Sequence, residues 1–353
     1  MGAKIAIMGT GAVGGYAGAH MAHAGEDVTF IDPWPEHVEH MRAHGLKITH
    51  IRDVPEFTAK VRALHVTDAQ QLAKEKPVDI AFVCMKSYDT EWATTLIAQY
   101  LSPNGFIVSL QNCMNEETIA GVVGWGRTVG CIASSITVDL CEPGHVRRAA
   151  GKSGSKHTVF RTGEVHGRVT DRVKEICRLV SLADSAIVTE NLWGERWSKL
   201  VTNVMGNGLS ACTGMITKDL MRDDTIRHFS ARLGSEAIRV GQALGYALEE
   251  IHHLDPELIA RAGENDAEAS RAYDEHRLAE AAKGGGEHRP SMGQDMVKGR
   301  RTEIQFLNGM VARKGEEIGL ATPANRVLTE IVTKVERGET KPDPKHIRDL
   351  RLN

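Results

Sequence analysis

Residues 4–32 decide the fold, and they read KIAIMGTGAVGGYAGAHMAHAGEDVTFID. The apolar run at 5–8 leads into the glycine pattern Gly9-x-Gly11-x-x-Gly14, a helix of small residues follows, and a second apolar run ends on Asp32. A glycine pattern alone is weak evidence. Between a strand and a helix, with an acidic residue about 20 positions further on, it is the fingerprint of a dinucleotide site. The sequence therefore predicts a strand–helix–strand unit that binds a dinucleotide.

The three glycines have separate roles in such a site. Gly9 permits the tight turn, Gly11 lets the backbone approach a pyrophosphate, and Gly14 allows the helix to pack closely on the strand. Backbone amides at the start of the helix, including those of Ala12 and Val13, are expected to bind the phosphates. The alternative is a glycine-rich turn without a ligand, which the combined pattern disfavours.

Asp32 indicates which dinucleotide binds. A carboxylate at the end of the second strand accepts hydrogen bonds from the ribose hydroxyls of NAD and repels the 2′-phosphate of NADP. No arginine or lysine follows Asp32 until Arg42, so no nearby cation is available for that phosphate. We expect NAD(H) as the cofactor, with NADP less favoured.

Composition limits the remaining possibilities. With 353 residues the chain can hold two domains, each with its own core. The formal charge of -3 provides no basic surface for nucleic acid, and no run of 18 apolar residues predicts a membrane span. The six cysteines include no Cys-x-x-Cys pair, and the N-terminus enters a strand without a signal peptide, which favours a reducing cytoplasm.

Sixteen histidines raise the question of a metal site. His37, His40 and His44 can share one face of a helix, but no histidine–carboxylate signature such as HExxH accompanies them. We therefore predict a solvated helix face there and no metal.

Short apolar segments rich in β-branched residues recur through the first half of the chain. They lie at 5–8, 28–31, 80–84, 106–110, 129–134, 157–161 and 186–189. Helical patterns or turns separate the early segments, which is typical of a mostly parallel, doubly wound sheet, whereas the later segments can pair antiparallel. Residues 1–190 are predicted to form an α/β, Rossmann-type dinucleotide-binding domain.

After Asn191 long helix-period segments replace the β-branched runs, at 195–214, 225–244 and 292–319. Residues 191–353 are therefore predicted to form a helical domain, and its role in substrate binding and dimerisation is implied by the family resemblance given below. Within it, residues from about 251 to 290 form an elaboration. Asp255-Pro256 begins a helix there, and the triplet at 284–286 interrupts the helical pattern.

The helical half carries a polar stripe of Lys199, Asn203 and Asn207, spaced i, i+4 and i+8. On one helix these side chains share a face. The default alternative is a solvated stripe, but apolar neighbours such as Trp197 and Val204 suggest a helix too apolar for solvent. Buried polar groups need partners, and a substrate can be one.

Polar residues elsewhere in the chain can join this stripe. Ser291, Asp295 and Glu303 are expected on one side of a single long helix. Lys86 and Asn112 each follow an apolar strand, where open α/β sheets place residues that contact ligands.

Together these motifs resemble the ketopantoate reductase (2-dehydropantoate 2-reductase) family. The matching elements, in order, are the glycine loop, Met85-Lys86-Ser87, Leu110-Gln111-Asn112, Trp197-Ser198-Lys199-Leu200 with Asn203 and Asn207, Ser291-Met292-x-Gln294-Asp295, Arg301-Thr302-Glu303-Ile304 and Leu307-Asn308-Gly309. They span nearly the whole chain. The resemblance implies a helical domain like the C-terminal domain of 6-phosphogluconate dehydrogenase, and a place in pantothenate biosynthesis.

The resemblance also implies residue roles. Lys199 would be the general acid that protonates the carbonyl oxygen as hydride arrives, and Glu303 would orient that lysine and the bound ligand or ribose. The substrate-binding positions implied by the family are Asn203, Asn207, Ser291 and Asn112. Lys86 and Asn112 match positions beside the nicotinamide end of the cofactor.

The chain departs from the family pattern in three places. Cys113 stands where the family usually has glycine after Gln-Asn, Asp32 stands where many members use a basic residue to hold NADP, and the segment 251–290 is longer than usual. All three concern cofactor or substrate, so retained chemistry with altered specificity is expected. Cys113 is interpreted as a packing or pocket residue, because no histidine or carboxylate motif accompanies it.

Several functions fit this sequence. The first is NAD(H)-linked interconversion of a 2-oxo acid and a 2-hydroxy acid, with ketopantoate as the default substrate. The second is an NAD-dependent D-2-hydroxy acid dehydrogenase for a branched or aromatic substrate. The third is a non-catalytic NAD(H) sensor, but a sensor would not need all five polar residues of the site, namely Lys199, Asn203, Asn207, Ser291 and Glu303. The most remote possibility is a sugar-phosphate or opine dehydrogenase. A homodimer is expected from the resemblance.

Overall fold

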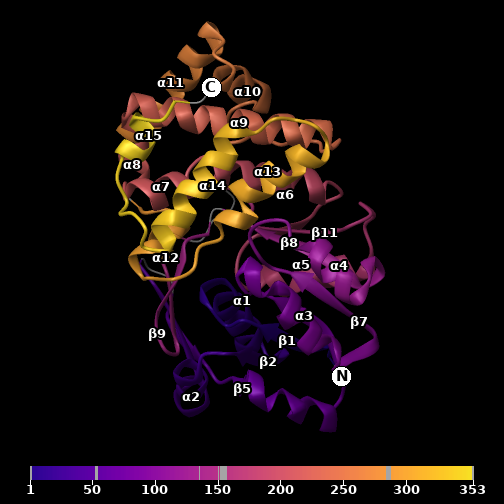
Figure 1. The fold of residues 1–353 in the computed structure, drawn as a ribbon. Helices are drawn as coiled ribbons and strands as arrows, with labels where there is room; N and C mark the ends of the chain where they lie inside the picture. The colour runs from indigo at the N-terminus through magenta and orange to yellow at the C-terminus, as the bar shows by residue number, and fades with distance from the viewer. Residues whose placement is uncertain are drawn as a thin grey trace. The chain divides into compact units, whose positions relative to one another are not determined.

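A computed structural model describes residues 2–51, 55–134, 136–149, 151, 157–283 and 288–351. The chain forms two compact units, residues 1–192 and 193–353. In Figure 1 the first unit runs from indigo to magenta, and the second continues to yellow at the C-terminus.

An eight-stranded sheet organises the first unit. Its order is β12 (Ala186–Val188), β11 (Phe160–Glu164), β8 (Thr128–Ala133), β7 (Leu101–Ser109), β6 (Val78–Val83), β1 (Lys4–Met8), β2 (Asp27–Asp32) and β5 (Arg62–His65). All neighbours pair in parallel except β8 and β11, which are antiparallel. The predicted doubly wound α/β fold is confirmed, including an antiparallel pairing among the later strands.

Helices and apolar cores cover both faces of this sheet. The helices are α1 (Ala12–His23), α2 (Pro35–His44), α3 (Thr90–Ala98), α4 (Glu116–Val123) and α5 (Asp171–Ser181), with short 3-10 helices η1 (Val66–Lys74), η2 (Ser87–Asp89) and η3 (Trp125–Arg127). Along β1, Ile5 and Ile7 enter one core while Ala6 and Met8 enter the other. This explains the continuous apolar run of β1, since a parallel strand is buried on both sides.

A second sheet of four strands was not predicted from the sequence. Its order is β4 (Phe57–Ala59), β3 (Leu46–His50), β10 (His145–Arg148) and β9 (Val138–Glu142). Helix α1 contacts strands of both sheets and therefore lies between them. A Cβ atom added to Gly15 would lie 3.2 Å from Val146 of the small sheet, and one added to Gly18 would lie 2.7 Å from Phe30 of the large sheet. The small residues of α1 are thus explained by close packing on two sides.

The second unit is built from helices, as predicted. They are α6 (Leu192–Val204), which begins at the boundary, α7 (Asn207–Thr213), α8 (Thr217–Arg222), α9 (Asp224–Ala243), α10 (Pro256–Gly263), α11 (Ala267–Ala282), α12 (Ser291–Val297), α13 (Asn308–Glu317), α14 (Pro323–Glu336), α15 (Lys345–Arg348) and the 3-10 helix η4 (Ile304–Phe306). Among the helices that the structure describes, none is both long and apolar enough to cross a membrane.

The described part of the segment predicted as an elaboration, at about 251–290, contains α10 and α11, which lie beside α9 in Figure 1. Asp255 caps α10 by accepting a hydrogen bond from the Glu257 amide at 2.7 Å, and Pro256 occupies the first helical position, which confirms the predicted helix start. The glycine triplet expected to interrupt the helical pattern lies outside the described residues.

Two predicted long helices are interrupted, and both predictions were therefore wrong in extent. The helix expected at 195–214 breaks at Met205-Gly206, where Gly206 has φ -132° and ψ -40°. The helix expected at 292–319 ends at Val297 and is followed by Gly299 at φ +62°, a backbone conformation that glycine adopts without steric cost. Asn207 therefore lies on a different helix from Lys199.

Candidate functional site

The glycine loop joins β1 to α1, and its geometry explains two of the three glycines. Gly9 has φ +91°, and a Cβ atom there would lie 2.5 Å from the Met85 sulfur. A Cβ atom on Gly14 would lie 2.2 Å from the carbonyl oxygen of Gly9 and 2.7 Å from Cβ of Cys84. These contacts are too short for any side chain, so the turn and the close packing of α1 both require glycine.

Gly11 differs, because within the described residues nothing lies within 4 Å of a Cβ atom added there. It is the N-cap of α1 and supplies no side-chain cap to the first amides of the helix. Gly11, Ala12 and Val13 are partly exposed, whereas Gly14 to Ala19 are buried. Uncapped amides at a helix N-terminus attract anions, so this end of α1 fits the pyrophosphate of a dinucleotide.

Asp32, at the end of β2, holds the glycine loop in place. Its Oδ2 accepts hydrogen bonds from the backbone amide of Thr10 at 2.7 Å and from its hydroxyl at 2.8 Å. Its Oδ1 accepts one from the Trp34 amide at 2.9 Å, and the residue is only 7% exposed. A carboxylate has about four acceptor positions, so capacity for a ribose hydroxyl remains on Oδ1. The sequence did not reveal this second role of Asp32.

His37 is fully buried, which corrects the prediction of a solvated histidine face, although His40 and His44 are exposed. Its Nδ1 accepts a hydrogen bond from the Gly144 amide at 2.9 Å, so Nε2 must carry the proton that is donated to the Thr10 carbonyl at 2.9 Å. The neutral ring therefore links the glycine loop to the turn between β9 and β10. The contacts of His37 with Thr10 and Gly144 explain its burial, and the spacing of residues along the helix does not.

Acidification is expected to destabilise the protein through His37. Burial lowers the pKa of His37 below the ordinary value near 6.5. The unfolded chain then binds more protons than the folded one, so the His37 contribution is present above about pH 6.5 and is lost as pH falls toward the folded-state pKa. Urea unfolding between pH 8 and 5 should show a steeper loss of unfolding free energy for wild type than for His37→Gln. Equal slopes would contradict this, and the exposed His40→Gln serves as control.

The loops that follow β6 and β7 are linked by two buried amides. Gln111 Nε2 donates to the Met85 carbonyl and to the Thr90 hydroxyl, both at 2.8 Å. Asn115 Nδ2 donates to the Ser87 hydroxyl at 3.2 Å and to the carbonyl of Asn112 at 2.7 Å.

These bonds hold together the two loops that carry Lys86 and Asn112. Strands β6 and β7 pair in parallel, so both loops lie at the carboxyl edge of the sheet, the edge at which such sheets bind ligands. Sequence reasoning assigned no role to Gln111 or Asn115. The only signal was that both amides follow β7 closely in the sequence.

Cys113 is buried and has φ +66°, a conformation that disfavours any residue with a Cβ atom. Glycine adopts this conformation without strain, which explains why it suits this position in the family that the sequence resembles. The cysteine at this position is therefore strained. We expect Cys113→Gly to unfold with a free energy about 1 kcal/mol higher than Cys113→Ala, because both lose the sulfur and only alanine keeps the steric penalty. Chemical denaturation measures the difference. An alanine variant at least as stable as the glycine variant would contradict it.

In the helical unit, α6 carries Lys199 and Asn203, both partly buried, and α7 begins with Asn207. Asn207 Nδ2 donates to the hydroxyl of Ser291, the first residue of α12, at 3.4 Å. Helices α7 and α12 approach closely, since a Cβ atom on Gly293 would lie 2.3 Å from the Ser210 hydroxyl. The structure thus brings Asn207 and Ser291 together although 84 positions separate them.

Glu303 is buried and immediately precedes η4. Its neighbour Thr302 donates backbone and hydroxyl hydrogen bonds to Glu336 of α14, which anchors this segment. Because α12 ends at Val297, the predicted alignment of Ser291, Asp295 and Glu303 on one helix is wrong. The pairing of Glu303 with Lys199 stays a prediction.

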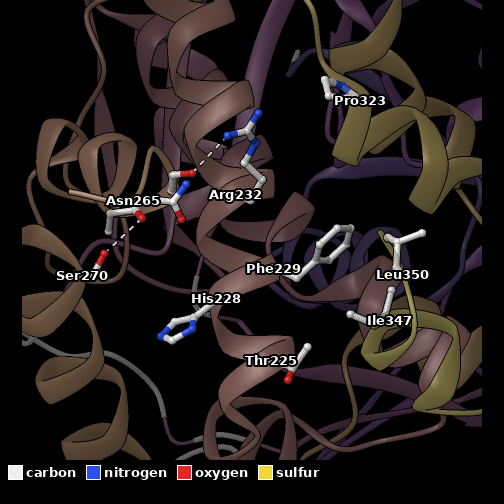
Figure 2. A pocket seen from close by; sticks show the side chains of 11 residues that line it. Thr225, His228, Phe229, Arg232, Asn265, Ser270, Pro323, Ile347 and Leu350 are labelled. Carbon is white, nitrogen blue, oxygen red and sulfur yellow. Dashed lines mark hydrogen bonds between the residues drawn. The ribbon is translucent and has the colours of Figure 1, made fainter. Parts of the chain in front are cut away.

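A cavity of about 540 Å³ lies elsewhere in this unit (Figure 2). Residues of α9, the α10–α11 region and the C-terminal segment line it, among them Phe229, Arg232, Asn265 and Leu350. Arg232 donates to the Gly263 carbonyl at a long 3.4 Å, drawn as a dashed line. None of the predicted site residues is in its lining, so this cavity is not the candidate substrate site. No cluster suited to a metal ion occurs among the residues that the structure describes.

Comparison with known proteins gives a consistent result for both units. Residues 5–159 match the family model described as Ketopantoate reductase PanE/ApbA, and residues 191–336 match its C-terminal model. A 2-dehydropantoate 2-reductase of Archaeoglobus fulgidus is 28% identical over 343 residues, which cover 95% of this chain and 98% of that protein.

Two solved structures extend the comparison. A PanE/ApbA family ketopantoate reductase from Ralstonia eutropha superposes with a TM-score of 0.77 at 26% identity, covering 95% of this chain and 99% of the other. D-mandelate dehydrogenase, in its ternary structure with NADH and anilino(oxo)acetate, superposes with a TM-score of 0.76 at 25% identity and the same coverage.

Proposed function

The chain belongs to the ketopantoate reductase family, and from this premise we propose that it is an NAD(H)-preferring reductase of a 2-oxo acid, with ketopantoate as the default substrate. Family membership supports an oxidoreductase that acts on CH–OH groups. The choice of NAD(H), the substrate and the residue roles are our proposal.

One observation carries the proposal: Asn207 of α7, the helix that follows the Lys199- and Asn203-bearing α6, hydrogen-bonds to Ser291 of α12, and α12 packs against α7. Amide and hydroxyl groups recognise the carboxylate and hydroxyl oxygens of a small organic acid. An ammonium group in the same unit supplies the acid that a carbonyl reduction needs.

In the proposed reaction, bound NADH would supply the hydride that reduces the carbonyl carbon of the 2-oxo acid. The Lys199 ammonium donates its proton to the carbonyl oxygen, which becomes the hydroxyl of the product, and the lysine is left neutral. Asn203, Asn207 and Ser291 hold the acid, and Glu303 orients the Lys199 side chain. On the cofactor side, the α1 amides would hold the pyrophosphate, Asp32 would hold the ribose, and Lys86 and Asn112 would contact the nicotinamide end.

A second candidate is an NAD-dependent D-2-hydroxy acid dehydrogenase for a branched or aromatic substrate. Three observations favour it: the likeness to D-mandelate dehydrogenase, the acidic Asp32 at the end of β2, and the buried side chain of Cys113 at a position where the family usually has glycine. Both candidates use the same residues in the same roles and differ in the substrate side chain and the favoured direction. A homodimer remains a prediction.

Initial rates of NADH and NADPH oxidation separate these candidates. The purified protein is assayed with ketopantoate and with a panel of branched and aromatic 2-oxo acids. Ketopantoate as the best substrate, with NADH preferred, supports the first proposal. Fast NADH-linked reduction of other oxo acids with poor use of ketopantoate supports the second, and a clear preference for NADPH contradicts the role of Asp32.

A further inference from the structure

The junction between α6 and α7 is held by side chains from two other helices. Helix α6 ends at Val204 and α7 begins at Asn207, so carbonyl groups at the break lose their helical partners. The Val204 carbonyl accepts a hydrogen bond from Asn308 Nδ2 at 3.3 Å, and the Met205 carbonyl accepts one from the Ser230 hydroxyl at 2.7 Å. Asn308 is the first residue of α13, and Ser230 belongs to α9.

Asn308 belongs to a buried chain of hydrogen bonds. Its Nδ2 also donates to Asn325 Oδ1 at 2.9 Å, and Asn325 Nδ2 donates to Glu236 Oε2 at 2.9 Å. The Glu236 carboxylate further accepts the backbone amides of Ala324 and Asn325, both at 3.0 Å, and so caps the start of α14. Asn308 and Asn325 have no exposed surface, and Glu236 is 6% exposed. Helices α9, α13 and α14, which carry this chain, pack against one another (Figure 1).

The Glu236 carboxylate fixes the direction of every bond in the chain. A carboxylate only accepts, so Asn325 must present its NH₂ group to Glu236 and its Oδ1 to Asn308. Asn308 must then present its own NH₂ group, and that same group reaches the Val204 carbonyl.

This direction leaves Asn308 Oδ1 on the opposite side, where it has no hydrogen-bond partner among the described residues. A Cβ atom on Gly208 of α7 would lie 3.1 Å from that oxygen. A buried acceptor without a partner costs free energy. Both hydrogen bonds of the Asn308 side chain are thus donated by its NH₂ group, one to the Val204 carbonyl at the junction and one to Asn325.

We propose that Asn308 is a positioning residue that fixes the α6–α7 junction and thereby the placement of Lys199 and Asn203 relative to Asn207. The structural part of this proposal, that Asn308 fixes the junction, depends only on the hydrogen bonds. Its catalytic part, that the junction places Lys199, rests on the proposed function. Ser230 also stabilises the junction, by donating a hydrogen bond to the next carbonyl, that of Met205.

The test combines deuterium exchange with kinetics on the full chain. In Asn308→Ala, the peptide that contains Met205, Gly206 and Ser210 should exchange its amide protons at least about fivefold faster than in wild type, because a junction carbonyl loses its donor. The kcat for the best 2-oxo acid should fall about 10- to 100-fold, and the dissociation constant for NADH should stay within about twofold, because only substrate-binding and proton-donating groups are displaced.

Two further variants keep the proposal falsifiable. Ser230→Ala removes the hydroxyl that donates to the Met205 carbonyl and should show the same pattern at smaller amplitude. It keeps the test decisive if Asn308→Ala does not fold. Thr329→Val is the matched control, since its buried hydroxyl donates to the Asn325 carbonyl within α14. It should change stability without changing junction exchange or kcat.

The outcomes separate this inference from the proposed function. Wild-type exchange at the junction in both Asn308→Ala and Ser230→Ala overturns the inference whatever the enzyme reduces. Faster exchange with unchanged kcat overturns the positioning role, provided that Lys199→Ala is inactive. If Lys199→Ala keeps full turnover, the proposed function fails, and the exchange data still decide whether Asn308 holds the junction.

Discussion

Replacing Lys199 by alanine is expected to lower kcat about 10²- to 10⁴-fold, the usual contribution of a positioned general acid. Without the ammonium group the alkoxide that forms on hydride arrival has neither a proton donor nor a compensating charge. Lys199 lies on α6 of the helical unit, whereas the dinucleotide fingerprint lies in the first unit, so the dissociation constant for NADH should change little. Steady-state kinetics and a fluorescence titration with NADH measure the two quantities.

Two control variants make this result specific. Lys334→Ala removes an exposed lysine from α14 in the same unit and should leave kcat unchanged. Lys199→Arg keeps a positive charge but holds its proton too firmly to act as an efficient acid, so it should recover substrate affinity more than kcat. Turnover by Lys199→Ala equal to wild type would remove Lys199 from the mechanism.

Replacing Asp32 by alanine is expected to lower the ratio of kcat/KM for NADH to that for NADPH about 10-fold or more, since hydrogen bonds to a charged group are worth about 1.5–3 kcal/mol. Two effects add in this variant. NADH loses its ribose acceptor, and the 2′-phosphate of NADPH no longer meets a negative charge. Initial rates with both cofactors at several concentrations give the ratio.

The structure requires a control, because Asp32 also binds Thr10 in the glycine loop. Thr10→Val removes the hydroxyl hydrogen bond to Asp32 and leaves the carboxylate in place. If Asp32 contacts the ribose, Thr10→Val should weaken both cofactors equally and keep their ratio. An unchanged ratio in Asp32→Ala, with both cofactors weakened, would mean that the carboxylate serves only to hold the loop.

Predictions from the sequence were most accurate where the local residue pattern matches the burial that the fold imposes. Strand β1 and the glycines at 9 and 14 follow from an apolar run and from close contacts that no side chain fits, so the first βαβ unit was predictable in detail. The mostly parallel, doubly wound sheet was predicted from the same alternation of strands and helices, whereas its strand order and its edge strand β5 were not.

Predictions failed where distant residues decide the outcome. The break at Met205-Gly206 is stabilised by Ser230 and Asn308, which no local helix pattern contains. His37 is buried because Gly144, 107 positions away, donates to its ring. The small sheet, too, joins β3 in parallel to β10 of a distant segment.

In the candidate site, too, some residues could be identified from the sequence and others only from the structure. The resemblance supplied Lys199, Asn203, Asn207, Ser291 and Glu303 as a set, and the structure adds how two of them meet across 84 positions. It also adds residues that hold the loops and the junction, namely Gln111, Asn115 and Asn308. Gln111 and Asn308 bind backbone carbonyls of other segments, and Asn115 binds the Ser87 hydroxyl of the neighbouring loop. Such partners cannot be identified from spacing in the sequence.

Hydride transfer from NADH to the carbonyl carbon of a 2-oxo acid is the step that distinguishes the proposed enzyme from a protein that only binds the dinucleotide. The most direct measurement uses NADH deuterated at both C4 positions, with mass spectrometry of the acid product. We predict a 2-hydroxy acid that carries one deuterium at C2, formed by wild type and nearly absent with Lys199→Ala. Tight NADH binding with no deuterium in any acid of the panel would contradict hydride transfer and indicate a protein that binds the dinucleotide without using it as a reductant.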